Sequence, residues 1–442
     1  MRLWIRDPLA IFADDAERGF VVEGTRIAEG VGKGETPERI DATFDASRHV
    51  VLPGLVSTHH HFYQTLTRAH PSAINKPLFP WLVALYPIWA RLKPNHLRIA
   101  SRLALTELML SGCTTAADHH YLYPEGLENA VDIEVEEARA LAMRMTVSRG
   151  SMNLSKKDGG LPPDSVVQDE ATILADSERV LKLFHDPKPG AHIRIALAPC
   201  SPFSISKELM SESARLAERY DCQLHTHLCE TVDEEQFCLK MYGLRPVDLL
   251  EDTGWMSSRV WLAHGIHFNA DEIVRLGKAK VGVCHCAASN MVLASGICPT
   301  CELEAAGSSL GLGVDGSASN DSSNMMEAMR HALMIGRLRY GADKVTHRDV
   351  LRWATEGSAR CLGRSDIGRI AEGYEADLAL FTLDEPRFSG AHDPLAALVL
   401  CGAHRADRVM IAGEWRVVDG EPVGVDLAAL IAAHHEAARD FA

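Results

Sequence analysis

The segment VVLPGLVSTHHH, residues 50–61, joins an apolar run to three consecutive histidines. The apolar run predicts a buried strand that ends near Ser57. Because side chains two residues apart in a strand share a face, His59 and His61 point one way and His60 points the other. Imidazole is a common zinc ligand, so two imidazoles on one face of a strand end predict a metal site.

Short β-rich runs alternate with helical segments along the chain that follows. One such segment is PNHLRIASRLALTELMLSG, residues 94–112, in which apolar residues recur at helical spacing and Gly112 marks the stop. The predicted strands end near Ser57, Asp118, Arg149, Pro199, His227, His264, His285 and Asp315. Eight strand–helix alternations indicate an α/β fold, a parallel (β/α)8 barrel that carries its active site at the C-terminal strand ends.

The two ends of the chain have a different pattern. Residues 1–53 and 366–442 contain short strand-like pieces separated by turn residues, and residues 425–442 have the pattern of a terminal helix. Two β-rich segments that flank a barrel can pair into one small sheet domain. The expected division is therefore a barrel of residues 54–365 and a second domain built from both termini.

Composition narrows the class of protein. The 442 residues are 46% hydrophobic and 24% charged, which is typical of globular proteins. A net charge of −15 argues against nucleic acid as a partner, because binding it needs a clustered basic surface. The sequence has neither a signal-peptide pattern nor the roughly 18-residue apolar run of a membrane span. Eleven scattered cysteines predict free thiols and a cytoplasmic location.

Further metal-binding side chains stand at the later strand ends. A catalytic zinc ion takes three or four nitrogen or oxygen ligands and keeps a position open for water. LHTHLCE places two histidines on one face with Glu230 shortly after them, and GLGVDG supplies an aspartate. The candidates from spacing are His225, His227, His264, His267, His285 and Asp315, in addition to His59 and His61.

Two other motifs are weaker. Residues 311–316, GLGVDG, fit a dinucleotide-binding glycine pattern, but an aspartate stands where pyrophosphate would bind. Cys298 and Cys301 form a C-x-x-C pair without a second pair at zinc-ribbon spacing, which predicts inert thiols.

Together these motifs resemble the amidohydrolase superfamily, in its deaminase and chlorohydrolase branch. The resemblance runs from VVLPGLVSTHHH through LHTHLCE, LAHGIH, HCAASN and GVDGSASND to IGRIAEGYEADLALF. It implies a distorted (β/α)8 barrel with a small β-sandwich formed from both termini. It also implies metal ligands at His59, His61, His227 and Asp315.

The same resemblance assigns catalytic roles. Glu230 matches the glutamate that protonates a ring nitrogen, His264 the histidine that bonds the attacking water, and Asp315 takes part in proton transfer. His225 is expected to pack inside the barrel. Binuclear members of the superfamily bridge two metals with a lysine on the fourth strand, and AHIRIALAPC, residues 191–200, has no lysine. We therefore expect one divalent metal, zinc, per chain.

The implied reaction is hydrolytic deamination of a small aromatic heterocycle. The resemblance in residues 59–69, 77–92 and 118–124 implies an oxidised purine, 8-oxoguanine, as substrate, giving urate and ammonia. Hydroxytriazines, guanine and isoxanthopterin stay open as alternatives, as do a cyclic-amide hydrolase and a barrel without catalysis. Whether the chain forms a homo-oligomer is also open. The expected substrate-binding residues are Gln64, Trp81, Tyr123, Cys200 and Ser201; Gln64 could instead hold the histidines, and Trp81 could be core.

Overall fold

The computed structural model describes residues 1–441, and its largest sheet has eight parallel strands. The strands follow one another in the order β14-β13-β12-β11-β10-β9-β8-β7. The Thr58 amide donates to the Leu312 carbonyl at 3.0 Å, so the two outer strands meet and the sheet closes into a barrel. The strands are β7 (Leu55–Ser57), β8 (Cys113–His120), β9 (Arg144–Ser151), β10 (Ile193–Pro199), β11 (Gln223–Leu228), β12 (Val260–His264), β13 (Gly282–His285) and β14 (Leu310–Leu312).

These strands confirm the predicted (β/α)8 barrel. The main difference is at the eighth strand, which ends at Leu312, three residues before Asp315. The turn that follows carries Asp315 with a positive φ of 66°, a left-handed backbone conformation that cannot continue a strand.

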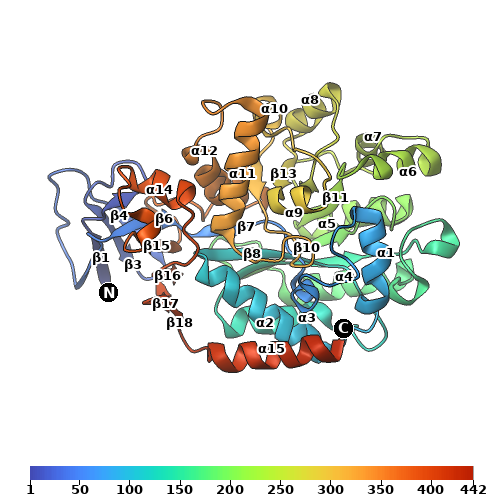
Figure 1. Cartoon of the computed structure of the whole chain (residues 1–442), viewed down its shortest axis with the longest axis horizontal. Helices are drawn as coiled ribbons and strands as arrows, with labels where there is room; N and C mark the ends of the chain where they lie inside the picture. The colour runs from blue at the N-terminus through green and yellow to red at the C-terminus, as the bar shows by residue number, and fades with distance from the viewer. Residues whose placement is uncertain (442) are drawn as a thin grey trace.

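Helices surround the barrel (Figure 1), and several of them begin at a residue whose side chain caps the helix. At the start of α5, for example, the Ser206 side chain accepts a hydrogen bond from the Leu209 backbone amide. The helices are η1 (Phe62–Thr67), α1 (Leu78–Trp89), α2 (Pro94–Leu110), α3 (Ala130–Ala140), η2 (Lys156–Asp158), η3 (Asp164–Val166), α4 (Glu170–Phe184), α5 (Lys207–Tyr220), α6 (Val232–Tyr242), α7 (Pro246–Asp252), α8 (Ala270–Ala279), α9 (Ala287–Val292), α10 (Thr300–Ala306), α11 (Met325–Tyr340), α12 (His347–Arg352), η4 (Trp353–Gly357) and α13 (Ser358–Cys361).

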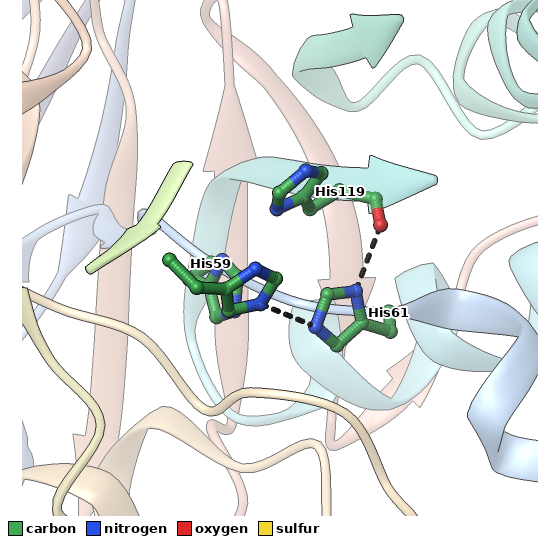
Figure 2. A group of neighbouring side chains, drawn as sticks. His59, His61 and His119 are labelled. Carbon is green, nitrogen blue, oxygen red and sulfur yellow. Dashed lines mark hydrogen bonds between the residues drawn. The ribbon is translucent and has the colours of Figure 1, made fainter. Parts of the chain in front are cut away.

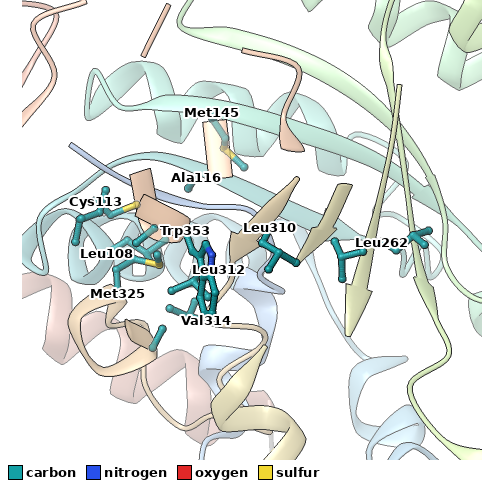
Figure 3. Close-up of a cluster of buried hydrophobic side chains, with 14 of the residues drawn as sticks. Leu108, Cys113, Ala116, Met145, Leu262, Leu310, Leu312, Val314, Met325 and Trp353 are labelled. Atoms are coloured by element: carbon teal, nitrogen blue, oxygen red, sulfur yellow. The ribbon is translucent and has the colours of Figure 1, made fainter. Parts of the chain in front are cut away.

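Apolar side chains fill the space between the strands and these helices. Figure 3 shows part of this core, where Leu310 and Leu312 of β14 lie near Trp353 of η4. All three side chains are almost fully buried. Because the apolar side chains of the strands and helices pack against one another in this core, the polar side chains at the C-terminal ends of the strands remain available to form a functional site.

The termini supply two further sheets. One has the order β4-β3-β1-β5, and the other has the order β18-β17-β16-β15-β6-β2. Strand β15 pairs antiparallel with β6, so the two ends of the chain share a sheet, as predicted. Ile5 and Phe20 of the first sheet pack with Leu378 and Met410 of the second, which makes a sandwich. The bounds are β1 (Arg2–Arg6), β2 (Ala10–Ile11), β3 (Gly19–Glu23), β4 (Arg26–Gly30), β5 (Ala42–Asp45), β6 (His49–Pro53), β15 (Leu378–Thr382), η5 (Pro386–Phe388), α14 (Pro394–Leu400), β16 (Arg408–Ile411), β17 (Glu414–Val418) and β18 (Glu421–Pro422).

The last helix leaves the sandwich and returns to the barrel. Helix α15 (Leu427–Phe441) lies along α2 and reaches η1, and it is drawn in red along the lower edge of Figure 1. None of the helices within residues 1–441 is long and apolar enough to cross a membrane.

Candidate metal centre and active site

Four side chains with nitrogen or oxygen donor atoms converge at the C-terminal end of the barrel. His59 and His61 follow β7, His227 lies in β11, and Asp315 follows β14. Asp315 Oδ1 lies 3.4 Å from the Nε2 atoms of both His59 and His61. The Nε2 atoms of His61 and His227 lie 3.2 Å apart. These distances show that the structure brings the four expected metal-binding residues together, and all four side chains are buried.

Hydrogen bonds on the far side of two of these rings fix the position of their protons. His61 Nδ1–H donates to the His119 carbonyl at 2.8 Å, as Figure 2 shows. His227 Nδ1–H donates to the Cys200 carbonyl at 2.7 Å. Because a carbonyl oxygen can only accept, each neutral ring carries its lone pair on Nε2.

His225 fixes the third ring in the same way. Its Nδ1–H donates to the Trp261 carbonyl at 2.8 Å, which leaves its Nε2 as an acceptor. His59 Nδ1–H donates to that acceptor at 2.8 Å, so the His59 lone pair also lies on Nε2. The His225 ring stacks on Trp261, with centroids 4.2 Å apart. His225 therefore packs inside the barrel and also orients His59.

The donor set fits a divalent cation. Three lone pairs and a carboxylate oxygen face one another, and His59 Nε2 has no hydrogen-bond partner within residues 1–441. Burial, together with His61, lowers the pKa of His227 to about 3. His227 is therefore neutral near pH 7, and no proton on it relieves the repulsion between its Nε2 lone pair and that of His61. Imidazole nitrogens and a carboxylate are the ligands that zinc takes in catalytic sites.

His119 belongs to the same group, although the sequence reasoning did not select it. Its ring nitrogens lie close enough to those of His59, His61 and His227 for all four to share an ion. His119 Nε2–H donates to the Ala198 carbonyl at 2.9 Å, and the ring stacks on His227 at 4.7 Å. Strand alternation separates His119 from Asp118 and His120, but it does not say which face of β8 is turned inward; the structure places His119 on the inner face.

Glu230 and His264 lie beside the metal-binding group. His264 Nε2 is 3.5 Å from Glu230 Oε2 and 3.9 Å from Asp315 Oδ2. On its other side, His264 Nδ1–H donates to Asn290 Oδ1 at 2.9 Å. Burial raises the pKa of Glu230 to about 7, helped by the nearby Asp315 carboxylate and opposed by His264. Glu230 can therefore hold or release a proton near neutral pH.

Backbone strain is present at two residues of this group, His264 and Asp315. His264 has a φ of 71° and Asp315 a φ of 66°, both in the left-handed region that glycine normally occupies. Such conformations persist where the surrounding structure imposes them, and they cluster at functional sites. Here they turn both side chains from strand ends toward the same centre.

A cavity lies above the group formed by His59, His61, His227 and Asp315. Three of the four proposed ligands, His61, His227 and Asp315, lie in its wall together with Glu230 and His264. The remaining wall is mainly apolar and aromatic. The lining residues are His61, Gln64, Leu78, Trp81, Leu82, Tyr86, Tyr121, Cys200, Ser201, Phe203, His227, Glu230, His264, Leu293, Asp315 and Ser319. A wall of this composition suits an aromatic ring system.

Two expected substrate-binding residues are fixed by the same stretch of backbone. Gln64 Oε1 accepts a hydrogen bond from the Ala318 amide at 3.3 Å. Trp81 Nε1–H donates to the Ala318 carbonyl at 3.1 Å. With its oxygen engaged, Gln64 has its amide N–H groups left to donate. Trp81 contributes to both the cavity wall and the core behind it.

A model of the amidohydrolase family matches residues 50–416. The chain belongs to this family. It is 63% identical over 441 residues to the 8-oxoguanine deaminase of Pseudomonas aeruginosa, covering 99% of this chain and 98% of that protein. It is 36% identical over 411 residues to an isoxanthopterin deaminase from an unknown prokaryotic organism, covering 88% and 85%.

Solved structures of other amidohydrolases have the same fold. The atrazine chlorohydrolase of Arthrobacter aurescens TC1, complexed with zinc, superposes with a TM-score of 0.92 at 32% identity. The match covers 99% of this chain and 100% of that one. A divalent metal is thus a feature that this amidohydrolase shares with its structural neighbours, in agreement with its donor set.

Of the other expected site residues of this amidohydrolase, two line the cavity and one does not. Cys200 and Ser201 line the cavity, whereas Tyr123 is not among the lining residues in the part of the chain that the structure describes. The Tyr123 ring packs under the Arg149 guanidinium at 3.9 Å, which accounts for its position away from the cavity. Cys298 and Cys301 are free thiols near the start of α10, as expected.

Proposed function

We propose that this amidohydrolase hydrolyses 8-oxoguanine to urate and ammonia in its barrel of residues 54–365. The observation that carries the proposal is the 63% identity, over 99% of the chain, to an 8-oxoguanine deaminase. We also propose one zinc ion per chain, held by His59, His61, His227 and Asp315. The 11 free cysteines support a reducing, cytoplasmic location.

The cavity supports a planar purine substrate. Its aromatic and aliphatic walls suit the two faces of a ring, and its polar groups gather near the metal-binding residues. The Gln64 amide N–H groups can donate to a ring carbonyl, which an oxopurine presents and an aminopurine lacks. Cys200 and Ser201 in the wall are our candidates for contacts to the opposite edge of the ring.

A bound divalent metal would supply Lewis-acid chemistry and make water reactive near neutral pH. Asp315 would accept the proton of the attacking water and pass it to the leaving amine. Glu230, whose raised pKa lets it carry a proton at neutral pH, would protonate the ring nitrogen next to the reacting carbon. His264, fixed by Asn290, lies between the two carboxyl groups and would orient the water.

The test is ammonia release from a panel of heterocycles by the purified, zinc-loaded protein. We expect kcat/KM for 8-oxoguanine to exceed the values for guanine, isoxanthopterin and a hydroxytriazine. Isoxanthopterin and a hydroxytriazine stay in the panel because an isoxanthopterin deaminase and a hydroxydechloroatrazine ethylaminohydrolase are 36% and 37% identical to this chain. For the hydroxytriazine, the released ethylamine is measured in place of ammonia. A higher value for any of the other three would contradict the substrate assignment. Absence of ammonia or ethylamine release from all four would contradict the aminohydrolase assignment.

A further inference from the structure

We propose that His434, in the last helix, positions the substrate-binding segment η1 and so sets the affinity for substrate. This inference rests on the proposed function, because it assigns Gln64 of η1 to the substrate. His434 Nε2 lies 3.1 Å from Thr65 Oγ1, although the two residues are 369 positions apart in the sequence. Thr65 directly follows Gln64.

The direction of this hydrogen bond follows from its neighbours. Thr65 Oγ1–H donates to the Phe62 carbonyl at 3.0 Å, so the hydroxyl oxygen is left to accept. His434 Nε2–H must therefore be the donor. Burial lowers the pKa of His434 to about 4, helped by Arg68, so the imidazole is neutral and keeps this single donor at neutral pH.

The hydrogen bond between His434 and Thr65 acts on the short turn that leads from His61, a proposed metal ligand, to Gln64. Phe62 directly follows His61, and the backbone N–H of Gln64 donates to the His61 carbonyl at 3.0 Å. By tying Phe62 to α15 through Thr65, His434 restrains the turn that presents Gln64. Trp89 restrains the far end of the same segment, since its Nε1–H donates to Thr67 Oγ1 at 3.2 Å.

Packing around this hydrogen bond shows that α15 is seated firmly. Ala437 and Phe441 are buried in the same apolar cluster as Tyr63 of η1 and Trp81, and Trp81 lines the cavity. His96 of α2 bonds the Asp440 carboxylate near the end of α15 at 3.0 Å. A helix held at its end in this way can hold His434 in place while η1 binds and releases substrate.

The test compares His434→Phe with His434→Gln. Phe fills the space without a donor, whereas the Gln amide can restore the donor to Thr65. We expect His434→Phe to raise KM for 8-oxoguanine about three- to tenfold, the effect of one neutral hydrogen bond, with kcat and zinc content unchanged. His434→Gln should return KM to within about twofold of the wild-type value. His435→Gln, at the exposed neighbouring position, is the matched control.

A double variant shows whether the effect passes through Thr65. Thr65→Val combined with His434→Phe should raise KM no more than the larger single change, because both remove the same hydrogen bond. An unchanged KM in His434→Phe, or a fall in kcat and zinc content that Gln does not restore, would overturn the proposal. If the wild-type protein released no ammonia from 8-oxoguanine, the proposed function would fail instead.

Discussion

The Nε2 atoms of His61 and His227 lie 3.2 Å apart, and each carries a lone pair because each Nδ1–H donates to a backbone carbonyl. Two acceptors at this distance repel each other unless a cation lies between them. Asp315 Oδ1, 3.4 Å from His61 Nε2, adds a negative charge to the same point. The repulsion among these three acceptor atoms is therefore relieved only when a cation is bound.

Removing the metal should lower the stability of the folded chain. Metal binding to the native state alone contributes about 4 kcal/mol when the ion is present at 1,000 times its dissociation constant. We expect chelation to lower the melting temperature and re-addition of zinc to restore it. His227→Ala should purify with little metal, and its melting temperature should respond little to the chelator. A wild-type melting temperature insensitive to metal removal would contradict this expectation.

Loss of the Glu230 carboxyl group should affect turnover rather than metal binding. Glu230 lies beside His264, and we do not assign it as a ligand. We expect Glu230→Gln to keep its zinc and to lose about 10²- to 10⁴-fold in kcat, the usual contribution of a general acid. Asp233→Asn, at an exposed position in α6, is the control and should behave like the wild type. Wild-type kcat in Glu230→Gln would show that another group moves the proton.

The barrel and the convergence at its open end were predictable because both follow from strand alternation. Histidines on one face of successive strand ends must approach one another when parallel strands close into a barrel. His119 could not be assigned in this way. Asp118, His119 and His120 are consecutive, and only the barrel shows that the middle one points inward while the other two face Glu134 of α3.

Long-range packing was the other part that sequence patterns could not supply. Tyr123 lies next to a predicted strand end, yet its contact with Arg149 takes it away from the cavity. The terminal helix was visible in the sequence as a helix, but its amphipathic pattern does not say which surface it covers. Its hydrogen bond to Thr65 depends on how the chain returns from the sandwich to the barrel.

The pH dependence should reflect the carboxyl group of Glu230. Its pKa is raised to about 7, mainly by burial, and in the proposed mechanism the protonated form donates to the ring. Burial opposes ionisation of Asp315, but neighbouring histidines, His264 among them, hold its pKa well below its usual value, so it stays ionised. We therefore expect kcat/KM to fall as pH rises through about 7. In Glu230→Gln this high-pH decline should disappear from the residual activity, and its persistence would assign the ionisation elsewhere.

The buried ion pairs beneath the barrel should contribute strongly to stability. Arg144 of β9 is fully buried and lies 2.7 Å from both Glu375 and Asp377, which lead into β15. Replacing Arg144 with Met would leave the buried Asp377 carboxylate without its cation and Glu375 with Arg26 alone, at 3.2 Å. Breaking a buried pair from one side costs about 3–5 kcal/mol.

We therefore expect Arg144→Met to lower the free energy of unfolding by about 3–5 kcal/mol in a urea titration. Arg259→Met is the matched control, because Arg259 pairs with the exposed Asp221 at 2.9 Å, and exposed pairs contribute about 0–1 kcal/mol. Since Arg144 joins the barrel to the segment entering the sandwich, its loss should also broaden the transition or split it in two. Equal stabilities of the two variants would show that the carboxylates find other partners or take up protons.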